Sequence, residues 1–374
     1  MKKIALLLAF MLLLLASCKA AETSNTPAGD TSEETRTIAG YEFTKNSIAN
    51  DTGSTVVNVY NWGEYMNRDL NDAFEYVTGI TVNYKDYPSN EVLYSTLKSG
   101  GTNYDVIIPS DYMIALLIEE DMLEPLNFNN IPNFSDIDPQ LKNPVYDPEN
   151  SYSVPYMWGT VGIVYNTTMV SEEITSWGAL FDPKYSGNIL MFDNPRDCIG
   201  IALKYLGYSY NTTDESEIRA AQALLVEQKP HVQAYVMDQI FDKLEGGEAA
   251  IGPYYTGDAI TMMESNGDLA FVIPEEGSNI FVDAFCIPKG AKNKSAAEMY
   301  INFMCSYNAG YANMEEICYS TPLLSVYNDL DAEIAEDGIS YPDDELRAKC
   351  EVFLNLPRSV RELYDSLWSD LKIQ

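Results

Sequence analysis

The stretch TVVNVYNWGEYMNRDLNDAFEYVTGITVNY, residues 55–84, shows the pattern that organises the folded part of this chain. Its first six residues are rich in β-branched side chains and predict a strand. Residues 69–78 then carry apolar side chains at helical spacing before Gly79, and the run at 80–84 predicts a second strand. Strand, helix and strand in this order are typical of parallel strands joined by a crossover helix.

The same alternation continues along the chain. We expect a helix from Asn90 to Gly100, a strand at 104–109 and a helix from Ser110 to Glu120. After a passage rich in proline and asparagine, further strands are predicted at VGIVYN (161–166), NILMFD (188–193), AAIGPYY (249–255) and FVDAFCIP (281–288), with helices between and after them. The sequence therefore predicts an α/β protein with two lobes, each a doubly wound and mostly parallel sheet.

The first residues of the chain have the features of a bacterial export signal. Lys2 and Lys3 precede the uninterrupted apolar run at 4–15, which is too short to span a bilayer. The sequence Leu-Ala-Ser-Cys that ends at Cys18 resembles the bacterial lipobox, whose cysteine receives lipid. We expect residues 1–17 to be a signal peptide, Cys18 to be lipidated, and 18–54 to be a flexible tether.

The charge balance restricts the classes of ligand. The 374 residues include 23 Lys and Arg, 56 Asp and Glu and one His, for a net charge of −33. This excess of acid argues against binding of nucleic acid, whose phosphates require basic surfaces, and against binding of anionic lipid headgroups. The field of such a protein instead favours a cationic ligand.

Aromatic residues and carboxylates follow the ends of several predicted strands. Two α/β lobes of this kind bind ligands in the crevice at the carboxyl ends of their strands. The residues there are Asn61 to Tyr65, Ser110 to Tyr112, Asp193 to Asp197, Tyr254 to Asp258, and Phe281 with Asp283. Carboxylates can pair with ammonium groups, and flat rings can cover methylenes or accept a cation on their faces.

Most of the binding free energy for such a ligand must come from its charged ends. Four buried methylenes contribute only about 3 kcal/mol, at ~0.8 kcal/mol each. Micromolar affinity requires ~8 kcal/mol. The carboxylates must therefore supply the larger share of the binding free energy for an alkyl diammonium.

Several motifs resemble the spermidine/putrescine-binding proteins of polyamine ABC transporters. They are YNWGEY (60–65), YDVIIPSDY (104–112), SYSVPYMWGTVGIVYN (151–166), TSWGALFDPKYSGNILMFDNPRD (175–197) and ICYSTP (317–322), and the resemblance covers residues 55–374. It implies a two-lobed periplasmic-binding-protein fold of type II, with lobe 1 at 55–160 and 283–327 and lobe 2 at 161–282 and 328–374. It also implies a monomer without cofactor or catalytic activity, anchored by lipid to the extracytoplasmic face of the cell membrane, that delivers polyamine to ABC permease subunits.

Matching the motifs position by position assigns the ligand-binding residues that the resemblance implies. They are Trp62, Glu64, Tyr65, Ser110, Tyr112, Asp197, Tyr255, Asp258, Phe281, Asp283 and Tyr319. The acids would hold amine groups, Trp62, Tyr255 and Phe281 would line the methylene slot, and Tyr112 and Tyr319 would form hydrogen bonds. Gly63, Asn194, Tyr255 and Phe281 depart from the family pattern, and Asp258 is similar to an acid of putrescine-preferring members. The resemblance therefore implies putrescine, spermidine or both as the ligand.

Two other functions are open from the sequence. Adjacent tyrosines such as Tyr254 and Tyr255 can bind ferric ion through their phenolates in proteins of the same general fold. An anchored enzyme would usually carry G-x-S-x-G or H-E-x-x-H, and neither occurs, nor does a phosphate-binding G-x-x-x-x-G-K-[ST]. Paired carboxylates leave glycoside hydrolysis open on composition alone.

Overall fold

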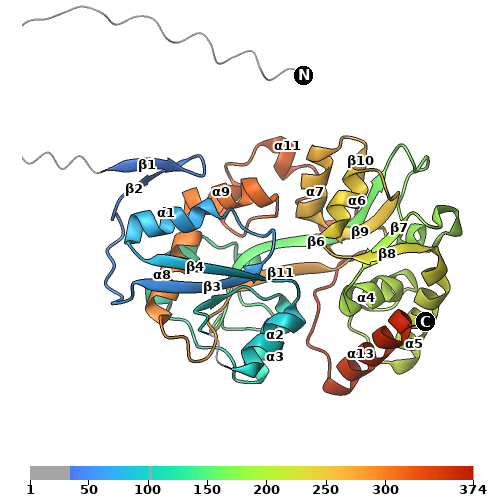
Figure 1. Ribbon diagram of the computed structural model, residues 1–374, viewed down its shortest axis with the longest axis horizontal. Helices are drawn as coiled ribbons and strands as arrows, with labels where there is room; N and C mark the ends of the chain where they lie inside the picture. The colour runs from blue at the N-terminus through green and yellow to red at the C-terminus, as the bar shows by residue number, and fades with distance from the viewer. Residues whose placement is uncertain (1–33, 101–102, 374) are drawn as a thin grey trace, which may run out of the picture. The chain divides into compact units, whose positions relative to one another are not determined.

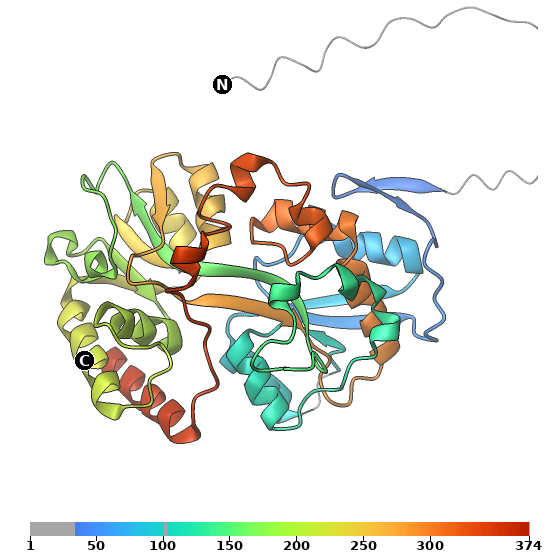
Figure 2. The same cartoon turned by 180° about the vertical axis from the view of Figure 1, so that it is seen from behind.

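The computed structural model describes residues 34–100 and 103–373 (Figures 1 and 2). In the first lobe, β3 (Val56–Trp62) pairs in parallel with β4 (Thr81–Tyr87) and with β5 (Val106–Ile107). The remaining elements of this lobe are α1 (Asp69–Thr78), α2 (Asn90–Ser99), α3 (Asp111–Glu119), the 3-10 helices η1 (Phe128–Asn130), η2 (Pro132–Asp136) and η3 (Pro139–Leu141), and α8 (Lys294–Met304), α9 (Tyr307–Ile317) and α10 (Leu324–Tyr327).

Helix α1 shows how local sequence produces this architecture. Its apolar face, which includes Leu70, Phe74 and Val77, is buried in the same apolar core as the side chains of β3. Gly79 ends the helix with a φ of 74°, and its N–H donates to the carbonyl of Glu75. A residue without a side chain adopts this left-handed conformation without strain, so the chain turns directly into β4.

The second lobe contains a mixed sheet. Its strands β7 (Ile189–Phe192), β8 (Val232–Val236) and β9 (Ile251–Tyr255) are parallel, whereas β6 (Val154–Asn166) runs antiparallel to β9 and to β10 (Leu269–Val272). The helices that follow these strands or complete the chain are η4 (Trp177–Phe181), η5 (Pro183–Tyr185), α4 (Pro195–Tyr205), α5 (Glu215–Gln228), η6 (Lys229–His231), α6 (Gln239–Glu245), α7 (Thr256–Ser265), α11 (Ala332–Ala335), α12 (Asp344–Arg347) and α13 (Arg358–Ile373).

Strands β6 and β11 (Ile280–Phe285) join the two lobes as an antiparallel pair, visible in both views (Figures 1 and 2). Thr160 lies opposite Ile280, and Asp283 lies opposite Met157 beside a register shift. A side chain at Gly162 would come within 2.3 Å of Phe271, so glycine allows β10 to lie close to the pair. The predicted α/β class with two lobes is confirmed, although these crossing strands are antiparallel.

The buried apolar residues form separate cores. One core draws on residues 161–273 and 356–371, and two adjoining cores draw on residues 43–157 and 281–326. Along the chain, the change between the first core and the two adjoining cores occurs within β6 and again just before β11. The exact lobe boundaries given above stay predictions.

The predicted tether is wrong for the part of it that the structure describes from residue 35. Strands β1 (Thr35–Ile38) and β2 (Tyr41–Thr44) form a hairpin, and Phe43 is buried in the first lobe with its ring 5.8 Å from that of Phe303. The chain then continues along α1, where Ile48 N–H donates to the Val77 carbonyl. The hairpin contacts α1 and α9 and buries only one apolar side chain, Phe43, so its sequence shows no apolar period that would predict two strands.

The remaining N-terminal predictions lie outside the described residues. They are the signal peptide at 1–17, lipidation of Cys18 and the first part of the tether. Within 34–100 and 103–373, no helix has the length and apolar character required to span a membrane.

Candidate functional site

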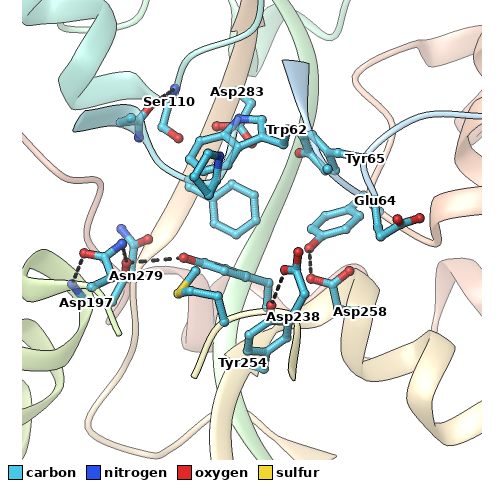
Figure 3. A pocket seen from close by; sticks show the side chains of 18 of the residues that line it. Trp62, Glu64, Tyr65, Ser110, Asp197, Asp238, Tyr254, Asp258, Asn279 and Asp283 are labelled. Carbon is cyan, nitrogen blue, oxygen red and sulfur yellow. Dashed lines mark hydrogen bonds between the residues drawn. The ribbon is translucent and has the colours of Figure 1, made fainter. Parts of the chain in front are cut away.

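One pocket collects residues from both lobes, at the carboxyl ends of β3, β5, β7, β8 and β9 and on β11 (Figure 3). Its empty volume is about 840 Å³, including the open mouth. All eleven residues predicted to bind ligand line it. This placement follows from the strand–turn–helix order, because the carboxyl ends of parallel strands meet at one edge of a sheet.

The pocket is strongly acidic. Among the described residues that line it there is no Lys, Arg or His, whereas six are carboxylic acids: Glu64, Asp111, Asp197, Asp238, Asp258 and Asp283. Such a concentration of like charge in a concave site is unfavourable unless a cation or protons compensate it. The site is therefore suited to a ligand with several positive charges.

Asp197 and Asp258 lie in the first turns of α4 and α7, where the N-terminal helix dipole favours an acid. Asp197 Oδ2 accepts hydrogen bonds from Asn194 Nδ2 at 2.7 Å and from the Tyr255 hydroxyl at 3.3 Å. Asp258 Oδ2 accepts one from the Tyr319 hydroxyl at 2.7 Å. Burial nevertheless raises the pKa of each carboxyl to about 7.

Two further acids lie deep in the pocket with an unsatisfied oxygen. Asp283 on β11 is 5% exposed, and its Oδ1 has no hydrogen-bond partner among the described residues. Burial raises the pKa of this carboxyl to about 6. Asp111 is 1% exposed, its Oδ2 likewise has no partner there, and burial raises its pKa well above the usual range. Buried acceptors of this kind are costly unless a donor reaches them.

Aromatic rings form a continuous row along the pocket. The ring centroids of Tyr255 and Phe281 are 5.5 Å apart, those of Phe281 and Tyr319 are 6.1 Å apart, and those of Tyr319 and Tyr65 are 4.8 Å apart. The contacts are edge-on, so each ring holds its neighbour at an angle. Trp62 is fixed nearby through its indole N–H, which donates to the Ile108 carbonyl at 2.9 Å.

The other predicted residues complete the walls at different depths. Glu64 is exposed and Tyr65 is buried, with a hydroxyl that has no partner among the described residues. Ser110 precedes α3, and the Tyr112 hydroxyl donates to Glu91 Oε1 at 3.0 Å. The arrangement presents carboxylates at several points along a row of rings, and it can hold separated positive charges joined by apolar segments.

The prediction from sequence omitted several lining residues, of which Asp238 and Phe353 stand out. Asp238 follows β8, a strand that the sequence analysis did not identify, so the acid at its end had no assigned position. Phe353 lies in the irregular segment before α13, with its ring 6.1 Å from that of Tyr112. A search for the apolar run VQAYV at 232–236 would have located Asp238. No comparable sequence signal marks Phe353.

The geometry does not support the ferric-ion alternative. The hydroxyls of Tyr254 and Tyr255 are directed to different carboxylates, Asp238 at 3.1 Å and Asp197 at 3.3 Å. Burial raises the pKa of both phenols well above 10, whereas iron ligation requires phenolates. Among the described residues there is also no group of three His, Cys, Asp or Glu side chains arranged to hold a metal ion.

Comparison with known proteins identifies the class. Residues 69–341 match the family of bacterial extracellular solute-binding proteins, and the chain belongs to this family. It is 35% identical over 328 residues to the spermidine/putrescine-binding periplasmic protein of Escherichia coli (strain K12), covering 87% of this chain and 94% of that protein.

Solved structures show the same similarity. The spermidine/putrescine ABC transporter substrate-binding protein PotD from Streptococcus pneumoniae strain Canada MDR_19A matches with a TM-score of 0.75 and 38% identity, over 86% of this chain and 99% of that chain. The lipoprotein Tp0655 (TpPotD) of Treponema pallidum matches with a TM-score of 0.76 and 25% identity, over 85% of this chain and 100% of that chain. These relatives are named as binding proteins or lipoproteins, and none of the three is named as an enzyme.

Proposed function

We propose that this protein binds linear polyamines, putrescine or spermidine or both, and delivers them to an ABC permease on the extracytoplasmic side of the membrane. The observation that carries the proposal is the pocket itself, where six carboxylic acids and a row of aromatic rings converge without a basic residue among the described lining residues. Each ammonium of the ligand would pair with carboxylate, and each methylene segment would pack on a ring.

The order of the acids along the aromatic row fits a linear polycation. Asp197 contacts Tyr255 at one end of the row, and Asp258 contacts Tyr319 toward the other. Asp283 lies two residues after Phe281 on β11, so both side chains project from the same face of that strand. Figure 3 shows Asp197 and Asp258 on opposite sides, with Asp283 between them at another level. Three acidic positions separated by rings match positive charges separated by methylenes.

Charge neutralisation supplies the driving force. Without ligand, burial raises the pKa values of Asp197, Asp258 and Asp283 to about 6–7, because isolated carboxylates are poorly solvated there. An ammonium at hydrogen-bond distance would favour the ionised carboxylate and lower each pKa. The low local dielectric strengthens that attraction, and the aromatic row excludes water from it.

The relatives support the remaining parts of the proposal. Proteins named as spermidine/putrescine-binding and as ABC transporter substrate-binding proteins are similar over most of the chain. We therefore assign permease subunits as the partner. The lipobox-like sequence that ends at Cys18 supports lipidation of this cysteine as the anchor, and we propose a monomeric binding protein without catalytic activity. Closure of the lobes would bend the paired strands β6 and β11, the segments that connect them.

Isothermal titration calorimetry on purified, ligand-stripped protein tests the proposal. Putrescine, spermidine and spermine are titrated in turn, and 1,4-butanediol serves as a neutral analogue of putrescine. We expect saturable one-to-one binding of at least one polyamine and no heat with the diol. Absence of binding with all three amines would refute the proposal, and equal binding of the diol would refute the role of charge.

A further inference from the structure

Asp238 is a carboxylate of the pocket whose position the motif comparison did not assign. It lies two residues after the end of β8 and immediately before α6, and it lines the pocket with Tyr254 and Asp258. The buried Tyr254 hydroxyl donates to its Oδ1 at 3.1 Å, which fixes the carboxylate in one orientation. Asp238 is exposed, and no hydrogen bond or ion pair described within residues 34–100 and 103–373 involves its second oxygen, Oδ2.

This free oxygen is directed across the cleft toward the other lobe. Oδ2 of Asp238 lies 3.6 Å from the position that a Cβ of Gly63 would occupy, so it faces the turn after β3. Because Gly63 has no side chain, nothing on that residue separates the carboxylate from the pocket. Figure 3 shows Asp238 and Asp258 side by side, with Glu64 on the opposing turn.

The electrostatics of the three acids show that they share one region. Burial is the main cause of the raised pKa of the Asp258 carboxyl, and the charges of Asp238 and Glu64 add to it. At the opposite end of the row, burial and the Glu91 charge raise the pKa of Asp197 to about 7, and the charge of the buried Arg196 partly offsets this rise. A buried cation therefore adjoins the Asp197 end of the pocket, whereas three acids gather at the Asp258 end.

A buried hydroxyl without a hydrogen-bond partner among the described residues, that of Tyr65, lies next to the end of the pocket at Asp258. Tyr65 is 6% exposed, its hydroxyl has no partner among the described residues, and its ring lies 4.8 Å from that of Tyr319, which donates to Asp258. Burial raises the pKa of this phenol, and the Asp283 charge and, to a smaller extent, the Asp258 charge add to the rise. The region thus combines a hydroxyl and carboxylates that lack a positive partner. A primary ammonium has three donors and can satisfy several such acceptors at once.

We propose that Asp238 is a further ligand-binding residue that, together with Asp258 and Glu64, holds a terminal ammonium of the polyamine. The inference rests on the proposed function and deepens it by assigning the residues that hold one terminal ammonium. Tyr254 is the positioning residue for this contact, because its hydroxyl holds Oδ1 and leaves Oδ2 toward the ligand. Diamines and triamines both have a terminal ammonium, so both use Asp238.

Calorimetric titration of the Asp238→Asn variant with putrescine and spermidine tests the assignment, with Asp242→Asn as the matched control. Asp242 is an exposed acid on the same helix, α6, and does not line the pocket. We expect Asp238→Asn to weaken the binding of both ligands by roughly ten-fold, as for loss of one charge-assisted contact of an exposed carboxylate that the bound ligand would cover. The control removes the same charge and is expected to change affinity by less than about two-fold, because distant exposed charges are screened.

A second variant, Tyr254→Phe, keeps the carboxylate and removes the hydroxyl that orients it. We expect a smaller loss of about two- to three-fold, and no further loss when the change is combined with Asp238→Asn, because both act through one contact. Equal affinities of Asp238→Asn and Asp242→Asn would overturn the inference while leaving the proposed function intact. If the unaltered protein binds neither amine, the proposed function itself fails. If Asp238→Asn does not fold, a Tyr254→Phe variant with unchanged affinity overturns the inference by itself.

Discussion

Replacing Asp283 by Asn removes one charge from the centre of the pocket and keeps the size of the side chain. Asp283 is 5% exposed and its Oδ1 lacks a partner among the described residues, so an ammonium bound there would be held in a nearly dry environment. Truncating one partner of a buried charge pair costs about 2–5 kcal/mol. This corresponds to roughly thirty-fold to several thousand-fold weaker polyamine binding, measured by calorimetry.

The same substitution should stabilise the ligand-free protein at alkaline pH. Burial raises the pKa of Asp283 from its ordinary 3.8 to about 6, so ionising it costs the folded state up to ~3 kcal/mol relative to the unfolded chain. That cost is absent below pH 4, increases between pH 4 and 6, and is complete above pH 6. Denaturant unfolding should therefore show Asp283→Asn to be more stable than the unaltered protein at pH 8 and nearly equal at pH 4.

Opposite effects on affinity and stability distinguish a binding residue from a structural one. A structural acid would lose stability on substitution, and any loss of affinity would follow from misfolding. Binding within two-fold of the unaltered protein, or reduced stability at pH 8 without ligand, would refute the reasoning. Asp242→Asn again serves as the control, because it removes an exposed charge outside the pocket.

Three other predictions concern the pocket and the N-terminal part of the chain. Because burial raises the pKa values of Asp197 and Asp258 to about 7, polyamine binding at pH 7 should release protons, and the affinity should fall as the pH falls below 7. Calorimetry in buffers of different ionisation enthalpy measures the proton release. Identical heats of binding in all buffers would contradict this prediction. Phe43→Ala should reduce the unfolding free energy by about 3 kcal/mol without changing polyamine affinity, since the hairpin packs on the first lobe away from the pocket; unchanged denaturant stability would show that the hairpin is only an appendage. Cys18→Ala should shift the protein from the membrane fraction to the soluble fraction, and continued membrane association would remove the lipid-anchor assignment.

Much of the pocket could be predicted because its residues follow local signals. The turn after β3, the start of α3 and the first turns of α4 and α7 each lie where an apolar run ends and a helix begins. These boundaries are encoded within a few residues, so the sequence alone places the acids and rings beside them at the crevice. Ten of the eleven predicted residues lie at such positions or on the last strand, whereas Tyr319 was assigned by the family resemblance alone. All eleven line one pocket, and their contacts with a ligand stay predictions.

The features that sequence did not predict depend on distant parts of the chain. The hairpin at 35–44 buries Phe43 only because α1 and α9 provide a surface for it. The antiparallel pairing of β6 with β11 joins segments more than a hundred residues apart, and no local period specifies it. Phe353 reaches the pocket from an irregular segment, through packing against Tyr112 and Tyr210. Such positions are set by tertiary contacts rather than by propensity.

A crystal structure of the protein with spermidine bound would test the central claim most directly. We predict ligand density along the row of Tyr255, Phe281 and Tyr319, with nitrogen atoms at hydrogen-bond distance from Asp283 and from Asp258. We also predict that the terminal nitrogen near Asp258 contacts Oδ2 of Asp238. Density for the amine outside this pocket, or nitrogens that contact none of these carboxylates, would contradict the account.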